Sequence, residues 1–493
     1  RDPMTKRIAL NDDNRRWWTL AAMCFALFMV MLDNTVVNVA LPSIQRDLGA
    51  TLSGLEWTVN AYTLAFGVLL VTGGRLGDIF GRRKVFLCGV VLFAASSAFI
   101  GFSQSEAWLV AGRAIQGIGA AFMMPATLSI ITNAFPPEER GKAIGTWAGV
   151  SALALAIGPV VGGFLVENVS WQSIFFINLP VAAGALAVTL FATRESRDET
   201  VTRQVDFPGI AAITAGLASL TLALVEANSW GWGSPRIIGL LALSVAGLGA
   251  FVSIERHHPA PMVDFAFFRS RTFLGANVVA FIVSFAMLAM FFFLTLYMQN
   301  VLRFSPLEAG VRFLPTTLMV IIVAPIAGRL SDRIGPRPLM TAGLTLVATS
   351  LFWQSFLTVD SGYGFLLPGF VLMGIGIALV MSPMSAAAMN AVDQTKAGVA
   401  SGILSMSRMV GGTLGVAVLG AFIGRQGQAD FVQSLGDGLV IGAIVAAIGA
   451  IVAWTLVSPH IGGAPSQPPV PAGELADPPA ESPTETAREP VGA

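Results

Sequence analysis

The residues best placed to do chemistry are polar side chains inside long apolar stretches of the sequence. Asp33 lies in the apolar run 17–42, about 16 residues from its start. In a helix that rises about 1.5 Å per residue, this is roughly 24 Å along the axis and inside the hydrocarbon of a bilayer. A charge there costs at least about 2.5 kcal/mol. Asp33 is therefore a candidate for proton exchange or for an ion pair inside the protein.

Arg113 and Gln116 form a second candidate pair, because they lie one helical turn apart in the apolar run 107–132. An unpaired arginine inside a membrane is as costly as an unpaired carboxylate, so Arg113 is the expected partner of Asp33. Two functions stay open for such a pair. It exchanges a proton during a transport cycle, or it is a static ion pair that joins two helices.

Other polar residues near Asp33 are candidates for binding a substrate. Asn34 and Asn38 lie one turn apart on the same run, and Tyr62 adds a polar aromatic ring from the next run. We expect these residues to line a cavity together with Asp33 and Gln116. Phe and Met residues of neighbouring runs extend this lining, which suits promiscuous binding, or they are ordinary packing and lipid contacts.

The composition indicates which elements position these residues. Of 493 residues, 54% are hydrophobic and only 12% are charged, with 29 Lys and Arg against 29 Asp and Glu. These values exclude a disordered chain, a basic nucleic-acid binder and a typical soluble enzyme. Fourteen apolar runs are long enough to span a bilayer. They cover residues 17–42, 54–74, 84–103, 107–132, 142–166, 171–192, 207–227, 236–255, 272–298, 308–328, 337–357, 363–385, 398–422 and 438–458. The sequence predicts an all-α integral membrane protein with 14 transmembrane helices.

Basic residues between the runs predict the orientation. With fourteen spans, 22 of the Lys and Arg residues fall on the side of the two termini and 5 on the opposite side. Basic residues are enriched in cytoplasmic loops, so both termini are expected in the cytoplasm of a bacterium, with the spans in its inner membrane. The segment after residue 458 is rich in Pro and Ala and is expected to be a disordered tail.

Two loops of the sequence resemble each other. Residues 74–83 and 328–337 share a Gly, an Asp and a second Gly, each at an offset of 254 residues. The Gly-Ile-Gly at 117–119 recurs at 374–376, at an offset of 257 residues. Two echoes in the same order indicate an internal repeat, which is the architecture of many secondary transporters with a binding site between the repeats.

The repeat divides the chain into five predicted parts. They are a cytoplasmic N-terminus at 1–16, a six-helix bundle at 17–192, a linker with two inserted helices at 193–271, a second six-helix bundle at 272–458 and a tail at 459–493. The two bundles are expected to rock against each other around a central site.

Several motifs carry a resemblance to a known family. The two glycine loops resemble the cytoplasmic signature of the major facilitator superfamily, and the inserted helix pair resembles its fourteen-helix drug/proton antiporter branch. Further stretches are similar to motifs of that branch: 32–42, 57–62, 113–117, 158–163 and 171–180. The resemblance covers about 17–458, nearly the whole chain.

This resemblance implies a mechanism for the candidate residues. Asp33 would be the site for protons and cationic substrates, and Arg113 would modulate it. Gly158 and Gly162 lie four residues apart, so one helix face is bare, and Pro159 permits a kink. The residues expected to control the conformational change are Gly74, Asp78, Gly81, Arg82, Gly158, Pro159, Gly162, Gly163, Asp332 and Arg408. The position of Arg408 fits either the cytoplasmic latch or the cavity.

The expected function is proton-coupled export of lipophilic or cationic compounds by a monomer in the lipid bilayer. The sequence has no P-loop, metal motif or catalytic cluster, so we expect no enzyme activity, no cofactor, no metal, no nucleic-acid partner and an ion gradient as the energy source. The alternative is an exporter of one metabolite, such as an antibiotic or a siderophore. A proton-coupled importer, a channel and a membrane enzyme fit the motifs less well. Stretches 318–320 and 404–407 carry no acidic residue, which argues against divalent cationic substrates.

Overall fold

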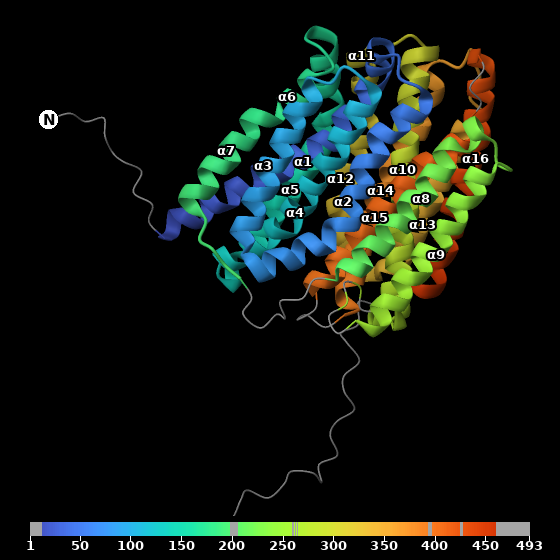
Figure 1. Cartoon of the computed structure of the whole chain (residues 1–493). Helices are drawn as coiled ribbons and strands as arrows, with labels where there is room; N and C mark the ends of the chain where they lie inside the picture. The colour runs from blue at the N-terminus through green and yellow to red at the C-terminus, as the bar shows by residue number, and fades with distance from the viewer. Residues whose placement is uncertain are drawn as a thin grey trace, which may run out of the picture.

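The chain folds into a bundle of long helices (Figure 1). The structure is a computed structural model and describes residues 12–197, 206–258, 261, 263, 265–392, 397–423 and 427–459. Much of the predicted segment 1–16 and almost all of the predicted tail 459–493 lie outside these residues. The helices of the first part are α1 (Asp12–Leu48), α2 (Leu52–Phe80), α3 (Arg82–Gly101), α4 (Glu106–Ala134), α5 (Pro137–Asn168), α6 (Ser173–Phe176) and α7 (Asn178–Ala192).

The rest of the described chain is helical too. Its α-helices are α8 (Phe207–Trp230), α9 (Pro235–His257), α10 (Arg271–Leu296), α11 (Pro306–Arg312), α12 (Leu314–Ile334), α13 (Pro336–Gln354), α14 (Tyr363–Asn390), α15 (Ala397–Phe422) and α16 (Gly427–Leu456). Two irregular helical turns, η1 (Phe265–Arg269) and η2 (Tyr297–Val301), flank α10. Long helices are expected, because each backbone polar group in a bilayer needs an internal partner.

The number of membrane spans differs from the prediction. In the described part of the chain, 12 helical segments are long and apolar enough to cross a membrane, and the predicted fourteen are not all among them. The two other predicted runs, 142–166 and 337–357, coincide with α5 and α13. In α13, Arg337 and several Thr, Ser and Gln residues lower the hydropathy of a helix of 19 residues. Part of the α5 side chains lie outside what the structure describes.

The packing order of the helices recurs along the chain. In the first half (α1–α7), α1 packs on α5 and α7, while α2 and α3 pack on α4. In the second half (α10–α16), α10 packs on α15 and α16, while α12 and α13 pack on α14. The internal repeat of the sequence thus has a counterpart in the contacts between helices.

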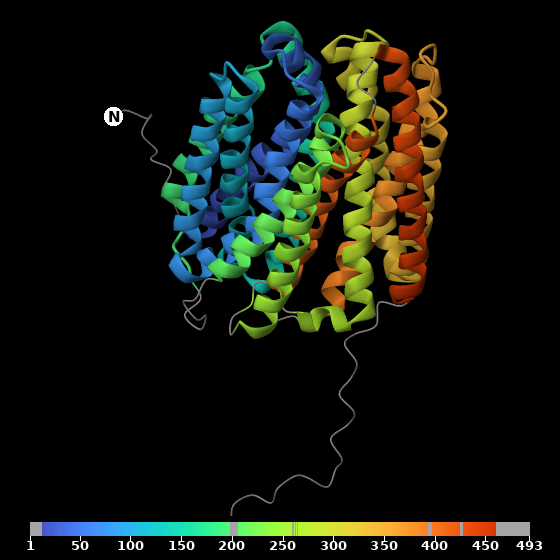
Figure 2. The same cartoon turned by 45° about the vertical axis from the view of Figure 1, so that its right-hand side comes forward.

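The inserted helices α8 and α9 form a hairpin beside the junction of the halves. The two helices pack on each other, and α8 also packs on α2 of the first half and α15 of the second (Figure 2). The Asn228 amide donates a hydrogen bond of 3.4 Å to the Gly420 carbonyl of α15. Only 17% of the apolar stretch of α9 is buried, so this helix presents most of its surface outward. The hairpin bridges the junction from outside.

The halves meet closely at the end of the bundle that carries α11. There the Gln299 amide donates to the Val39 carbonyl at 2.8 Å, and the Leu307 amide donates to the Glu167 carboxylate at 3.1 Å. Helix α5 packs more extensively on the short α11 than on the longer α12 that follows it. At the opposite end, which we call the linker end and which carries the α2–α3 and α12–α13 turns, α12 has exposed side chains such as Leu330 and Ile334. The halves are therefore closed at the α11 end.

Candidate functional site

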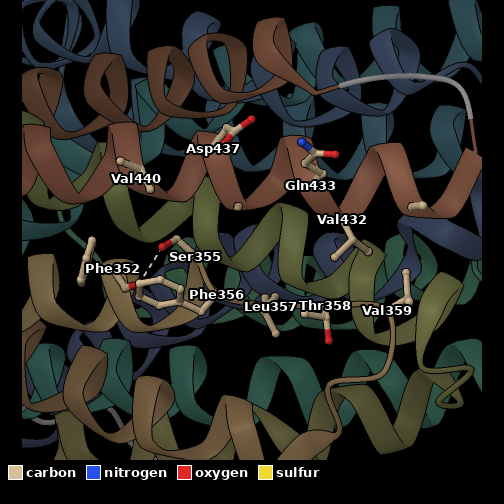
Figure 3. A pocket seen from close by; sticks show the side chains of 12 residues that line it. Phe352, Ser355, Phe356, Leu357, Thr358, Val359, Val432, Gln433, Asp437 and Val440 are labelled. Atoms are coloured by element: carbon tan, nitrogen blue, oxygen red, sulfur yellow. Dashed lines mark hydrogen bonds between the residues drawn. The ribbon is translucent and has the colours of Figure 1, made fainter.

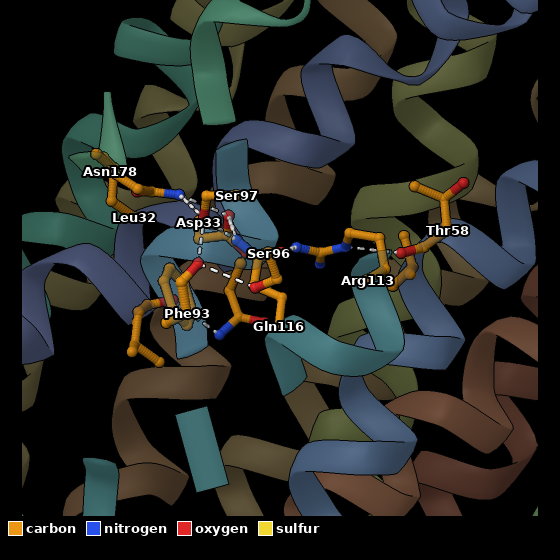
Figure 4. Close-up of polar contacts among 12 residues, drawn as sticks. Leu32, Asp33, Thr58, Phe93, Ser96, Ser97, Arg113, Gln116 and Asn178 are labelled. Atoms are coloured by element: carbon orange, nitrogen blue, oxygen red, sulfur yellow. Dashed lines mark hydrogen bonds and ion pairs between the residues drawn. The ribbon is translucent and has the colours of Figure 1, made fainter. Parts of the chain in front are cut away.

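Asp33 and Arg113 form an ion pair in the interior of the first half (Figure 4). Asp33 lies on α1 and Arg113 on α4, and their residues are 0% and 1% exposed. The Arg113 Nη1 donates to the Asp33 Oδ2 at 2.5 Å. Helix α1 lies between α4, α5 and α7, so a charge at its centre must find its partner inside the bundle. The structure brings together the two charges that the sequence pairs.

The second oxygen of Asp33 is also engaged. Its Oδ1 accepts from the Gln116 Nε2 at 2.9 Å and from the Asn178 Nδ2 at 3.2 Å. Both amides also donate to the Ser97 Oγ, at 2.9 and 3.2 Å. Gln116, Asn178 and Ser97 are all buried. Helices α3, α4 and α7 therefore hold the carboxylate with neutral donors on one side, while Arg113 supplies the charge on the other.

Arg113 has further partners besides the carboxylate. Its Nε donates to the Thr58 carbonyl of α2 at 2.9 Å, and its Nη1 donates to the Gln116 Oε1 at 2.6 Å. The Arg113 Cζ lies 4.2 Å from the centre of the Tyr62 ring and 5.9 Å from that of Phe175. Rings at these distances attract a cation, which compensates for part of the lost hydration of the guanidinium. The positive charge is thus held even if the carboxylate becomes neutral.

The ring of Tyr62, rather than its hydroxyl, makes the contact with Arg113. We expect Tyr62→Leu to lower the free energy of unfolding by about 2 kcal/mol, because a desolvated cation–π contact is lost. Tyr62→Phe keeps the ring and should change stability by much less. Thermal unfolding of both variants in detergent measures the difference. Equal losses in the two variants would show that the hydroxyl matters and the ring does not.

The other predicted substrate residues on α1 point elsewhere in this conformation. The Asn34 amide donates to the Val30 carbonyl at 3.1 Å, and the Asn38 amide donates to the Asn34 carbonyl at 3.3 Å. Both side chains thus bond back to their own helix, one turn earlier. Of the predicted residues, Asp33, Arg113, Gln116 and Tyr62 are brought together, whereas in the described structure Asn34 and Asn38 do not bond to the Asp33 carboxylate.

Sequence reasoning missed two members of this network, Ser97 and Asn178. Asn178 stands in an apolar stretch just before Pro180, in a motif that was noticed but given no chemical role. A polar residue at such a place in a membrane helix is itself a signal, because it needs a partner in the interior. Ser97 gives a weaker signal, because a serine can bond to its own helix, as the adjacent Ser96 does.

Asn178→Ala tests the contribution of the neutral donors. It removes one hydrogen bond to Asp33 and one to Ser97, and it leaves the ion pair intact. We expect the free energy of unfolding to fall by about 1–3 kcal/mol, because hydrogen bonds to charged groups contribute more than neutral ones. Thermal unfolding in detergent measures this loss. Asn168→Ala is the control, because the Asn168 side chain is exposed and its amide bonds to the Phe164 carbonyl of its own helix. A loss no larger than in the control would contradict the network.

The predicted residues of the first glycine loop lie at the turn between α2 and α3. The Arg82 Nε and Nη2 both donate to the Asp78 Oδ1, at 2.9 and 2.8 Å. Gly81 has φ 110°, a conformation that side chains other than glycine rarely adopt. Gly74 faces Pro125 of α4, where an added Cβ would lie 3.3 Å from its Cβ. The loop is therefore shaped by glycine and closed by one ion pair.

The second glycine loop is more open. Asp332 is exposed near the end of α12, and among the described residues no ion pair is recorded for it. Gly335 has φ 83°, so the second loop repeats the backbone turn of Gly81. The two loops share a conformation but differ in their charge contacts.

The glycines of α5 allow close approach to two different partners. An added Cβ on Gly162 would lie 2.9 Å from the Val36 Cα of α1, and one on Gly158 would collide with Thr35. On the neighbouring face, an added Cβ on Gly163 would lie 2.6 Å from the Leu307 Cα of α11. Pro159 lies inside α5. The bare face predicted from the spacing of Gly158 and Gly162 thus lies against α1 of the same half, whereas Gly163 contacts the other half.

A cavity lies apart from all these residues, between the end of α13 and α16 (Figure 3). Its volume is about 410 Å³. Ser355 and Phe356 form one wall, and Val432 and Val440 line the other. None of the predicted site residues contributes to it, so it has no part in the site around Asp33.

Comparisons with known proteins place the chain in a family. Residues 23–416 match the model of the Major Facilitator Superfamily, with a second match at 328–482. The chain is 40% identical to the tetracenomycin C resistance and export protein of Streptomyces glaucescens, over 83% of this chain and 76% of the relative. It is 36% identical to the puromycin resistance protein of Streptomyces alboniger, over 92% and 94%.

A second set of comparisons supports the assignment. The chain is 37% identical to the multidrug resistance protein Stp of Mycobacterium tuberculosis, over 82% of this chain and 75% of the relative. A crystal structure of a POT peptide transporter has the same fold, with a TM-score of 0.65 and 15% identity over 91% of this chain and all of the other. The family model and the relatives above 30% identity are those of transporters, which are not enzymes and use no cofactor. The chain belongs to the Major Facilitator Superfamily.

Proposed function

We propose that this transporter is a proton-coupled exporter of small lipophilic or cationic compounds, of the fourteen-helix drug/proton antiporter branch. Three of its relatives are named as resistance or export proteins for tetracenomycin C, puromycin and multiple drugs. The observation that carries the proposal is the buried pair of Asp33 and Arg113 in the interior of the first half. A buried carboxylate is costly to maintain and marks a proton pathway more often than a structural element.

The proton would act by changing the charge of Asp33. When a proton binds the carboxylate, its attraction to Arg113 is lost, and the pair between α1 and α4 loosens. Arg113 stays bound to the backbone carbonyl of Thr58, to the side-chain carbonyl of Gln116 and to the Tyr62 ring. When the proton leaves, the charge-assisted bond forms again. A change in the packing of α1 that depends on the proton couples the gradient to the rocking of the halves.

A direct role of Asp33 in binding cationic substrates is a finer proposal. In this conformation the carboxylate is 0% exposed, and protein donors occupy both of its oxygens. A cationic substrate would therefore compete with Arg113 for the Asp33 carboxylate and would have to displace it.

The orientation completes the proposed cycle. We place the linker end in the cytoplasm of a bacterium and both termini on that side, with α5 and α13 as the remaining two of fourteen spans. Closure at the α11 end then leaves the protein open toward the cytoplasm. The two six-helix bundles would rock about α1, α5, α10 and α15, and a monomer suffices for this.

The experiment is substrate-driven proton movement in liposomes. Purified protein is reconstituted with an imposed pH gradient, and tetraphenylphosphonium, ethidium and neutral 1-pyrenebutanol are added in turn. We expect at least one compound to dissipate the gradient with protein present and not in protein-free liposomes. Movement of the compound in the same direction as the proton, rather than against it, would contradict antiport and therefore proton-coupled export.

A dedicated exporter of one metabolite is the second candidate. The names of the tetracenomycin C and cephamycin export proteins favour it, since each relative is named for a single compound. The liposome panel separates the two candidates. Coupling by several unrelated compounds favours a multidrug exporter, whereas coupling by none of them favours a dedicated one.

A further inference from the structure

Arg408 is a second arginine in the middle of the bundle. It lies on α15, 11 residues after Ala397 and 14 residues before Phe422. At about 1.5 Å per residue, this is roughly 17 Å from one end of the helix and 21 Å from the other, so the residue is close to the middle of a bilayer. A charged residue at this depth faces the bundle interior or a cavity, and it needs a partner.

Arg408 lacks the partners that Arg113 has. Within the part of the chain that the structure describes, its side chain makes one hydrogen bond, from the Nη2 to the Ser405 Oγ at 3.4 Å, one turn earlier. Its Nε is buried and has no hydrogen-bond partner. Among the described residues, no carboxylate forms an ion pair with it. Arg113, in contrast, has a carboxylate, two carbonyl groups and two aromatic rings around it.

The faces of α15 indicate where Arg408 points. Ser401, Ser405 and Arg408 follow each other at helical spacing on one polar face. Residues on the other side of α15, namely Met406, Val410 and Leu414, pack against the largest cluster of buried hydrophobic residues in the described chain. A polar strip on a membrane helix is expected to face water or polar groups rather than lipid. Arg408 therefore points toward a wet or polar space.

That space lies at the junction of the two halves. Helix α15 packs on α10 of its own half and on α2 of the other half. The contact with α2 includes a hydrogen bond of 2.7 Å between the Thr63 and Thr413 hydroxyls. The polar strip starts near the linker end of α15, whereas the close contacts of α11 with the first half are at the other end of the bundle.

Helices α10, α14 and α15, all within the described chain, contain no Asp or Glu. Acidic residues of the other helices that pack on α15 lie away from the middle of this helix. Glu56 and Asp78 of α2, Glu226 of α8 and Asp430 of α16 are within five residues of a helix end, and Asp437 of α16 lines the cavity between α13 and α16. Asp33 is neutralised by Arg113 inside the first half. The net charge that the junction offers to a substrate at mid-depth is therefore positive.

We propose that Arg408 is the anion-binding group of the substrate site, so that the exported compound carries a carboxylate, a phenolate or a comparable acceptor on an apolar body. This rests on the proposed export function, and of the lipophilic or cationic compounds named there it keeps the lipophilic ones that carry such an acceptor and disfavours the cationic ones. A guanidinium binds such a group through two parallel hydrogen bonds. The Arg408 Nε, which has no hydrogen-bond partner among the described residues, would gain one when the substrate arrives. Cationic compounds would meet repulsion at the same point.

The experiment compares two probes with one apolar body and opposite charge. Binding of 1-pyrenebutyrate and 1-pyrenebutylamine to the purified full chain in uncharged detergent is measured by fluorescence anisotropy at neutral pH. We expect the acid to bind about tenfold more tightly than the amine, which corresponds to one charge-assisted contact. Tighter binding of the amine, equal binding of the two probes, or no binding of the acid would overturn the proposal.

Variants locate the preference. Arg408→Gln should remove the tenfold preference for the acid, while Arg408→Lys, which keeps the charge, should retain part of it. Arg236→Gln is the matched control, because Arg236 is an exposed residue at the start of α9 near the Trp230 ring. An unchanged acid-to-amine ratio in Arg408→Gln would overturn the proposal. If Arg408→Gln does not fold, the acid-to-amine affinity ratio of Arg408→Lys is compared with that of the wild type. An equal ratio in these two proteins would then overturn the proposal.

The outcome is separable from the proposed export function. Binding in detergent needs neither a proton gradient nor transport. A preference for the acid that depends on Arg408, found together with a failure of every compound to move protons in liposomes, would keep the anion site and remove proton-coupled export. Coupled export in liposomes, found together with tighter binding of the amine, would keep proton-coupled export and remove the anion site.

Discussion

Asp33→Asn is expected to reduce substrate-driven proton flux in liposomes to the level of protein-free liposomes. The variant keeps the shape of the side chain and removes the group that carries the proton. It also leaves Arg113 as a buried charge without a counter-ion, because the ion pair of 2.5 Å is lost. Breaking a buried pair on one side costs about 3–5 kcal/mol, so the free energy of unfolding should fall by this amount. Proton flux and thermal unfolding are measured on the same preparation.

A double variant separates the loss of function from the loss of stability. In Asp33→Asn combined with Arg113→Gln, no unpaired charge remains, so most of the lost stability should return. Proton flux should stay at background, because no group at this place binds a proton. Recovered flux in the double variant would show that the single variant failed only through instability. Normal flux in Asp33→Asn itself would show that another residue carries the proton.

Gly163→Val is expected to shift the protein away from the conformation that is closed at the α11 end. An added Cβ would lie 2.6 Å from the Leu307 Cα and from the Pro306 carbonyl oxygen, where backbone leaves no room. Overpacking of this kind costs about 1–3 kcal/mol, which corresponds to roughly a 5–150-fold change between two conformations. Export should fall, because the closed state at this end becomes less populated.

Spin-label distances measure that shift. Labels on cysteines at Lys142 of α5 and Asp332 of α12 report the separation of the halves at the linker end, in a background with Cys24 and Cys88 replaced by serine. Gly163→Val should increase the population with short distances. The matched control is Gly184→Val on α7, where an added Cβ meets nothing within 4 Å. The same distance distribution in both variants would contradict a role of Gly163 in closure.

The central ion pair was predictable from the sequence because charges inside long apolar runs have few alternatives. Asp33 and Arg113 must pair or face a cavity, and a turn of helix places Gln116 beside Arg113. The repeat of the glycine loops likewise pointed to the repeated packing order of the helices. These predictions rest on strong local constraints, so they needed no knowledge of the tertiary arrangement.

Other features depend on that arrangement and could not be predicted. The rotation of α1 decides whether Asn34 and Asn38 face Asp33 or bond back to their own helix, and spacing alone does not reveal it. The run 308–328 is divided between α11 and α12 by a short break around Phe313. The isolation of Arg408 also depends on which residues neighbouring helices present, since many acidic residues elsewhere in the chain were available as partners.

The measurement that tests the central claim most directly is an infrared titration of the carboxyl group of Asp33. Difference spectra between acidic and neutral pH are recorded for reconstituted wild type, Asp33→Asn and Arg113→Gln. We predict a carbonyl band of a protonated carboxyl group that is present in the wild type and missing in Asp33→Asn. Identical difference spectra of wild type and Asp33→Asn would show that Asp33 does not bind a proton, and the proposed coupling would be wrong.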